Sequence, residues 1–154
     1  MNLNGAEVVA ETNFVITKAE NSYSWSGYGF KLHVPDDALP EHASEYQVNI
    51  KATLSGQFEL PQGYKLVSAV YWVKAPGSFK KPVTVEIQHC GNTMDPNKLT
   101  FVVAKCTQKD LPYKFNPMKA GIFQPSSSYG VISLTKFSGP AVAAKEEVVH
   151  GCEA

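Results

Sequence analysis

The sequence has no excess of charge of either sign. Its 154 residues include 14 basic and 14 acidic side chains, so the formal net charge is zero. Proteins that bind nucleic acid usually carry a net basic surplus, and this balance argues against a nucleic-acid partner. Charged residues make up 18% of the chain and apolar residues 44%. This composition is typical of a folded protein and not of a disordered one.

Long hydrophobic runs are also missing. No segment approaches the roughly 20 apolar residues that a membrane-spanning helix needs, so we expect no membrane span. The opening residues lack the basic start and apolar run of a signal peptide, and we expect none. No Asn-X-Ser/Thr acceptor for glycosylation occurs. These absences together favour a cytoplasmic protein.

Cysteine is scarce, and the three that occur, Cys90, Cys106 and Cys152, have no framework spacing. We interpret them as reduced thiols, in agreement with a cytoplasmic protein. No pair of histidines or cysteines has metal-ligand spacing, so the sequence predicts no metal site. The glycines lack the frame of a phosphate loop, and the sequence predicts no cofactor.

Helical periodicity and internal repeats are absent too. Short alternating apolar runs separated by Gly and Pro turns predict an all-β protein, an antiparallel β-sandwich. The length suits one domain. Strands are expected over residues 6–17, 30–34, 45–54, 64–73, 83–88, 99–105, 131–135 and 141–144. Residues 21–29 are expected to form a turn region, and residues 107–125 irregular structure.

The clearest alternation runs from residue 45 to residue 54. Its apolar side chains are expected to face inward: Tyr46, Val48, Ile50, Ala52 and Leu54. The residues between them are expected to face outward: Gln47, Asn49, Lys51 and Thr53. Such a strand has one face against the core and one against solvent.

The middle of the chain, residues 64–90, has two strand-like runs joined by a Pro76-Gly77 turn. In the first run both faces are apolar, which predicts a strand covered on both sides. One face carries Val67, Ala69, Tyr71 and Val73, and the other carries Leu66, Val70 and Trp72. In the second run Val83, Val85 and Ile87 point inward, and His89 continues this face. An inward His at a strand end is interpreted as a neutral core residue, with a catalytic base as the alternative.

The same stretch carries a family resemblance. The matching motifs are Ser68-Ala69-Val70, Pro76-Gly77, Phe79-Lys80-Lys81-Pro82-Val83 and Ile87-Gln88-His89-Cys90, with a closing strand that leads to Phe137-Ser138. They resemble the ZU-five (ZU5) domain, which zona-occludens scaffolds, Unc-five netrin receptors, ankyrins and death-domain signalling proteins share. Asp37 stands where the family usually has Gly, and Asp tolerates a left-handed backbone.

The resemblance covers residues 22–144. It implies three parts: an N-terminal extension with a first strand over 1–21, a ZU5-type sandwich over 22–144, and a linker or tail over 145–154. It also implies a non-catalytic, sometimes autoinhibitory interaction domain within a larger intracellular scaffold or signalling protein. The partner would be another protein or a neighbouring domain of the same chain.

Two alternatives belong to other functional classes. Function-to-find domains, which are related, cut their own chain between Phe and Ser: the Ser hydroxyl attacks the preceding carbonyl and the ester is hydrolysed. Phe137 and Ser138 would be that bond here, with His89 as the candidate base, although Lys136 before them is a poor base when protonated. The other alternative is a carbohydrate- or surface-binding sandwich that uses Trp25, Tyr28 and Trp72.

Overall fold

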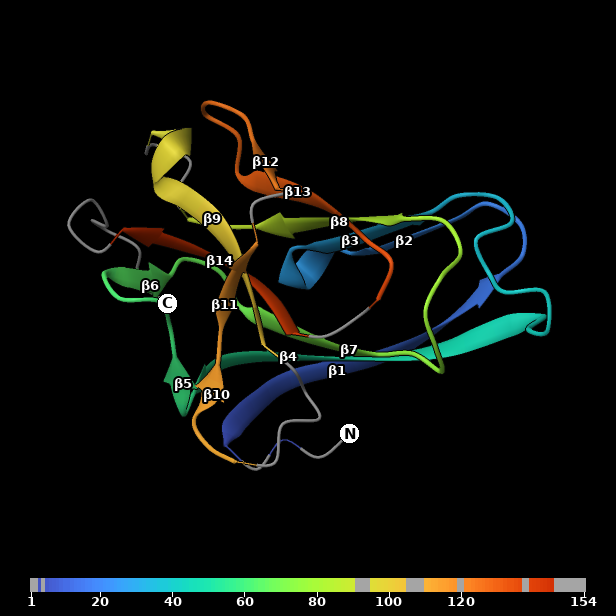
Figure 1. Cartoon of the computed structure of the whole chain (residues 1–154), viewed down its shortest axis with the longest axis horizontal. Helices are drawn as coiled ribbons and strands as arrows, with labels where there is room; N and C mark the ends of the chain where they lie inside the picture. The colour runs from blue at the N-terminus through green and yellow to red at the C-terminus, as the bar shows by residue number, and fades with distance from the viewer. Residues whose placement is uncertain are drawn as a thin grey trace.

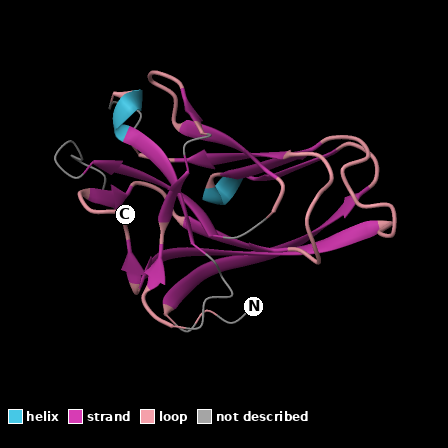
Figure 2. Cartoon of the chain, in the orientation of Figure 1, coloured by secondary structure: helices cyan, strands magenta, loops and turns pink. Residues whose placement is uncertain are grey.

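The chain forms layered β-sheets joined by short connections (Figure 1). The computed structural model describes residues 3, 5–90, 95–104, 110–118, 121–136 and 139–145. In this part of the chain, strands dominate and two short 3-10 helices, η1 (Ser26–Tyr28) and η2 (Pro96–Lys98), are the helical elements (Figure 2). The predicted all-β, antiparallel sandwich is confirmed.

Two sheets form the layers of the sandwich. The five-stranded antiparallel sheet has the order β12 (Ile122–Phe123), β13 (Tyr129–Leu134), β8 (Val83–Gln88), β3 (Phe30–Val34) and β2 (Asn21–Trp25). The three-stranded sheet has the order β1 (Ala6–Thr17), β4 (Glu45–Gly56) and β7 (Val70–Lys74). The long strands β1 and β4 run along the face of the molecule opposite β8 and β3 (Figure 1).

Two smaller sheets complete the fold. A four-stranded antiparallel sheet has the order β11 (Asn116–Met118), β9 (Leu99–Ala104), β14 (Gly139–Lys145) and β6 (Tyr64–Leu66). It lies at one end of the two layers (Figure 1). The pair β10 (Tyr113–Lys114) and β5 (Phe58–Glu59) is parallel and only two residues long.

The core between the two layers, called the sandwich core below, consists mainly of the inward residues of alternating strands. Val83, Val85 and Ile87 of β8 are fully buried, as predicted. Other strands of the fold contribute further members: Ile16, Phe30, Leu32, Val34, Val48, Ile50, Tyr71, Val73, Phe101, Ile132 and Val142. Alternation puts these side chains on one face of each strand, and burying that face drives the layers together.

A second core lies on the other side of β7. Phe58, Trp72, Tyr113 and Phe115, called the aromatic cluster below, pack together with ring centroids 4.9–6.3 Å apart. The buried Trp72 Nε1–H donates a hydrogen bond to Thr53 Oγ1 at 2.9 Å. β7 therefore has both faces covered, and the predicted division of its faces is confirmed.

The run from residue 64 to residue 73 is two strands in two different sheets, where the sequence predicted one. β6 ends at Leu66 and β7 begins at Val70. Between them, the Ser68 hydroxyl accepts a hydrogen bond from the Val142 N–H (2.8 Å) and donates one to the Ala69 carbonyl (2.8 Å). These bonds replace regular ladder pairing, so the chain passes from beside β14 to beside β4 at this point.

Two further expectations are wrong. Residues 21–25 form the edge strand β2, although the sequence predicted a turn region there. At the end of β4, Leu54 is 55% exposed and Thr53 is fully buried, the reverse of the expectation. Thr53 is buried because the aromatic cluster covers its side of the strand. Leu54 is exposed because the sandwich core ends at Ala52.

Candidate interaction surface

The outer face of the five-stranded sheet carries small polar and charged side chains around a shallow hollow. We call this the polar face, and it consists of Ser22, Ser24, Lys31, His33, Thr84 and Glu86. Within the described chain, no strand packs over it, since the packed side chains of the same strands lie on the inner face.

Strand register sets the arrangement of the polar face. Lys31 lies opposite Glu86, and His33 lies between Ser22 and Thr84 on the neighbouring strands. Cross-strand neighbours of opposite charge stabilise a sheet by about 0.2–1 kcal/mol. Lys31 Nζ also lies 4.3 Å from the centroid of the Tyr129 ring.

His33 is fixed on the polar face by a contact with its neighbour. Its Nδ1 lies 3.0 Å from the Ser22 hydroxyl oxygen, at hydrogen-bond distance. Alternation in the sequence placed Lys31, His33, Thr84 and Glu86 outward, but Ser22 was missed. β2 does alternate Ser22 and Ser24 with Tyr23 and Trp25, which is a strand signal. The Ser and Gly residues that follow it favoured the interpretation as a turn region.

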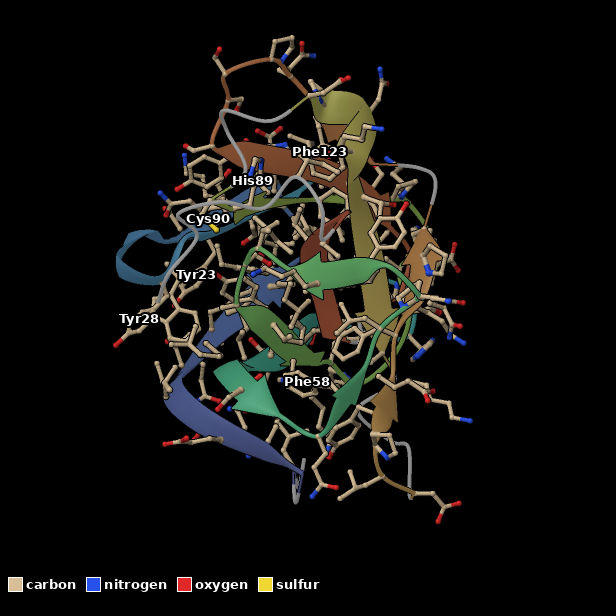
Figure 3. The ribbon with its side chains drawn as sticks, turned by 90° about the vertical axis from the view of Figure 1, so that its left-hand side faces the viewer. Tyr23, Tyr28, Phe58, His89, Cys90 and Phe123 are labelled. Atoms are coloured by element: carbon tan, nitrogen blue, oxygen red, sulfur yellow. The ribbon has the colours of Figure 1, made fainter. Side chains whose placement is uncertain are left out.

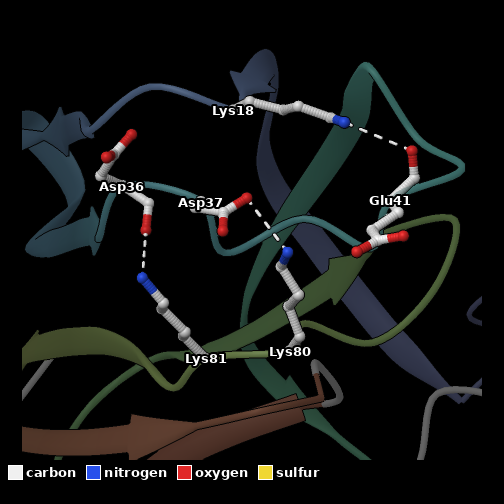
Figure 4. Close-up of polar contacts among 6 residues, drawn as sticks. All are labelled: Lys18, Asp36, Asp37, Glu41, Lys80 and Lys81. Carbon is white, nitrogen blue, oxygen red and sulfur yellow. Dashed lines mark hydrogen bonds and ion pairs between the residues drawn. The ribbon is translucent and has the colours of Figure 1, made fainter.

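Two lysine side chains bind the turn that follows β3 (Figure 4). Lys80 Nζ pairs with the Asp37 carboxylate at 3.1 Å, and Lys81 Nζ donates to the Asp36 carbonyl at 2.9 Å. Lys80 is the main cause of the lowered pKa of the Asp37 carboxyl. Asp37 has a φ of 59°, which confirms the expectation that it replaces a glycine in a left-handed position. These contacts connect the loop that follows β3 to the loop that precedes β8.

His89 is a buried residue at the end of β8, as expected (Figure 3). Its ring meets the Phe123 ring edge-on, with centroids 5.8 Å apart, and its backbone N–H donates to the Ser128 carbonyl at 2.8 Å. Burial lowers the pKa of the imidazole, so the ring is neutral at neutral pH. A catalytic function for His89 stays the alternative to this structural interpretation.

Phe137 and Ser138, the candidate self-cleavage bond, lie outside the described residues. The strand before them, β13, pairs Leu134 with Val83 at the start of β8, whereas His89 follows the other end of β8. At about 3.3 Å per residue, roughly 20 Å of strand separates Val83 from His89. The described structure therefore does not bring His89 to the end of β13 that leads toward this bond.

The aromatic residues proposed for a sugar site do not gather in one place. Trp72 is fully buried in the aromatic cluster, in agreement with the predicted strand covered on both sides, and it lacks the exposure that the sugar-binding alternative requires. Trp25 and Tyr28 do meet at the β2–β3 connection, with ring centroids 4.7 Å apart. The Tyr28 ring points outward into solvent there (Figure 3). The sugar-binding alternative is reduced to this pair.

Cys90 corrects the interpretation of the cysteines. It is disulfide-bonded, so the expectation of three reduced thiols is wrong. Its backbone N–H donates to the Val67 carbonyl at 2.9 Å, which ties the end of β8 to the β6–β7 connection. The other two cysteines, Cys106 and Cys152, lie outside the described residues.

Searches of the described residues give two further findings. No group of three or more His, Cys, Asp or Glu side chains in that part of the chain is arranged to hold a metal ion. None of the helices described there has the length and apolar character needed to cross a membrane.

Comparison with known proteins identifies a family. The family model described as the ZU5 domain matches residues 12–107, more than half of the chain. The match includes β2, β3, β4, β7 and β8, which supply most of the sandwich core, and the second half of β1. A search of curated proteins finds no match.

Proposed function

The chain belongs to the ZU5 family of protein-interaction domains, and we propose that it is a non-catalytic docking module in a larger scaffold or signalling protein. The partner is a second protein or a neighbouring domain of the same longer chain. Docking against a neighbour would give the domain an autoinhibitory function, and a death domain is one such neighbour in the family it resembles. The finer domain boundaries, 22–144 with flanking segments, remain part of this proposal.

The polar face is the observation that carries the proposal. The outer side of the three-stranded sheet is partly closed by the chain itself, because the aromatic cluster packs over Thr53 and Val70. The polar face has no such cover among the described residues. Contacts between domains of one chain are more polar than obligate interfaces, and a surface of Ser, Thr, Lys and Glu suits them.

Labelling of Lys31 tests this assignment. Amine-reactive labelling is compared between the isolated domain and a longer parent protein or its complex with a bound partner. Lys31 should react several-fold more slowly in the larger species, because docking covers its amine. Lys74, on the outer side of the three-stranded sheet, is the control and should react equally in both. Equal labelling of Lys31 in every larger species would reject the polar face as the docking site.

The non-catalytic part of the proposal has its own test. We expect the wild-type chain and Ser138→Ala to give the same single full-length mass after long incubation. A wild-type product cut after Phe137, absent from Ser138→Ala, would instead establish self-processing. Phe137→Ala is a useful second variant, because it changes the cleavage bond without removing the nucleophile.

A cytoplasmic location also belongs to the proposal, and it rests on the resemblance. The Cys90 disulfide argues against a cytoplasmic location, because cytosolic disulfides are rare and usually transient. Thiols can be alkylated inside cells before lysis, and Cys90 then examined by peptide mass. Alkylated Cys90 in the cytoplasmic pool agrees with the proposal, and complete oxidation of Cys90 contradicts it.

A further inference from the structure

The edge of β1 differs from the other sheet edges of the described chain. β1 is 12 residues long and, among the described residues, pairs only with β4, so no described strand lies along the other side of its backbone. The other outermost strands of the three larger sheets are shorter: β2 and β7 have five residues, β6 and β11 have three and β12 has two. β11 also contains Pro117. Long edges with free N–H and C=O groups recruit further strands unless the sequence blocks them.

The regular part of β1 lacks the lysines, prolines and bulges that commonly protect an edge, and Glu11 is its one charged residue. From Ala10 to Thr17 its pairing with β4 is unbroken, and the register shifts fall before Ala10. β1 contains no Lys, Arg or Pro. Three of the seven large apolar side chains exposed in the described chain lie on it: Val8, Val9 and Val15. An edge with these properties is a template for strand addition.

The sequence of β1 is self-complementary around Thr12. An antiparallel copy of β1 centred there brings Val15 opposite Val9 of the other copy, and Phe14 opposite Ala10. Asn13 then lies opposite Glu11. Exposed valines therefore meet valines on the outer side, and a half-buried ring meets a small side chain on the inner side. Such cross-strand pairs are the unit by which sheets are stabilised.

The neighbouring registers are worse. A pairing centred on Glu11 would put two carboxylates directly opposite each other, which is destabilising. A pairing centred on Asn13 would put each exposed Val15 opposite Glu11. Only even shifts keep the inner and outer sides of the two sheets continuous, because a one-residue slip exchanges the faces of a strand.

We propose that the chain forms a two-fold homodimer in which β1 pairs with β1 of a second copy, centred on Thr12, and the two three-stranded sheets become one six-stranded sheet. The arrangement is isologous and closes on itself, so it ends at two copies. It uses a surface on the opposite sheet from the polar face, so it goes beyond the proposed function and stands or falls separately. The contact spans only about seven residues, near 23 Å at 3.3 Å per residue, so we expect a weak dimer.

Sedimentation over a dilution series from millimolar to micromolar tests the dimer. The wild-type chain should shift from dimer to monomer. Val15→Lys should raise the dissociation constant at least about tenfold, because it places a charged side chain opposite the apolar Val9 of the other copy at two symmetric positions. Ile122→Lys is the matched control: it changes an exposed apolar residue on an edge strand of the other sheet and should leave the dissociation constant unchanged. A chain that stays monomeric at every concentration overturns the proposal, as does a dimer that Val15→Lys leaves intact. If the chain stays monomeric, a strand of a different protein becomes the better candidate for pairing with β1.

Asn13→Lys distinguishes the registers. In the register centred on Thr12 it places a lysine opposite Glu11 of the other copy at two symmetric positions, so the dimer should tighten by about two- to tenfold at low salt. In the register centred on Asn13 it would place two lysines opposite each other and weaken the dimer.

Amide hydrogen exchange of the wild-type chain is a second test of the dimer, and its result does not depend on whether any variant folds. Residues 9–15 should gain protection as the concentration rises, and no gain there overturns the proposal.

Discussion

The sandwich core and the aromatic cluster bury similar kinds of surface but are assembled differently. The sandwich core arises from strands of five to twelve residues, each contributing every second side chain. The aromatic cluster joins Trp72 of β7 to rings from β5, β10 and the residue after β10, where β5 and β10 have two residues each. Backbone hydrogen bonds between long strands hold the sandwich core together, whereas packing between rings holds the aromatic cluster together.

β7 links the two cores, because Tyr71 and Val73 enter the sandwich core, whereas Val70 and Trp72 lie on the side of the aromatic cluster. A change on β7 should therefore affect both cores, and a change on β10 or β5 should affect one. Local structure with few ladder bonds opens more readily than core strands do. We therefore expect the aromatic cluster to open separately from a more stable sandwich, and substitutions can test this.

Trp72→Ala should have the largest effect. Trp72 is fully buried, and truncation of a buried Trp to Ala typically costs about 3–5 kcal/mol of unfolding free energy. Urea unfolding followed by circular dichroism measures the loss as a lower midpoint at an unchanged slope. A loss below about 1 kcal/mol would mean that the surrounding rings close over the cavity, and the cluster would then not depend on its central ring.

Phe115→Ala separates the two cores. We expect a smaller loss of global stability than for Trp72→Ala, because the two-residue β10–β5 pair can open without the sandwich. Hydrogen exchange should show faster exchange over residues 113–118, with unchanged protection over β8. Equal loss of protection in both regions would show one cooperative unit and end the distinction between the cores.

Thr53→Val should have an intermediate effect. The substitution keeps the shape of the side chain but removes the acceptor for the buried Trp72 Nε1–H, which costs about 1–3 kcal/mol when a buried donor loses its partner. Thr84→Val on the polar face is the matched control and should change the unfolding free energy by less than about 0.5 kcal/mol. Equal effects of the two substitutions would mean that the Thr53 hydroxyl contributes nothing specific to the cluster.

The two cores also differ in how well the sequence predicts them. β3, β8 and most of β4 were predictable because one apolar face against a core leaves a period of two in the sequence. The aromatic cluster was not, since two-residue strands are too short to show a period. The reversed burial of Thr53 and Leu54 has the same origin. Alternation reports which face a side chain is on, but whether that face is covered depends on distant segments.

The polar face, like the fold, was predictable from the sequence only in part. The sequence placed Lys31 and Glu86 outward, on the face that the structure leaves open. Ser22 was missed because β2 is short and runs into a Ser- and Gly-rich segment, so its alternation of serines with Tyr23 and Trp25 was interpreted as a turn region. It also assigned reduced cysteines from their number alone, whereas the Cys90 disulfide depends on which chain segments meet in space.

The smallest expected effect concerns His89, whose burial beside Phe123 fixes one end of the sandwich core. Burial lowers the pKa of its imidazole below the usual 6.5, so the folded protein binds fewer protons than the unfolded chain on acidification. This contribution to stability is complete above about pH 6.5 and is lost as the pH falls below it. The thermal midpoint should therefore drop less between about pH 7.5 and pH 5.5 in His89→Gln than in the wild type. His33→Gln, on the exposed polar face, controls for the removal of one histidine, and an unchanged slope in His89→Gln would mean that other groups set the acid sensitivity of the sandwich.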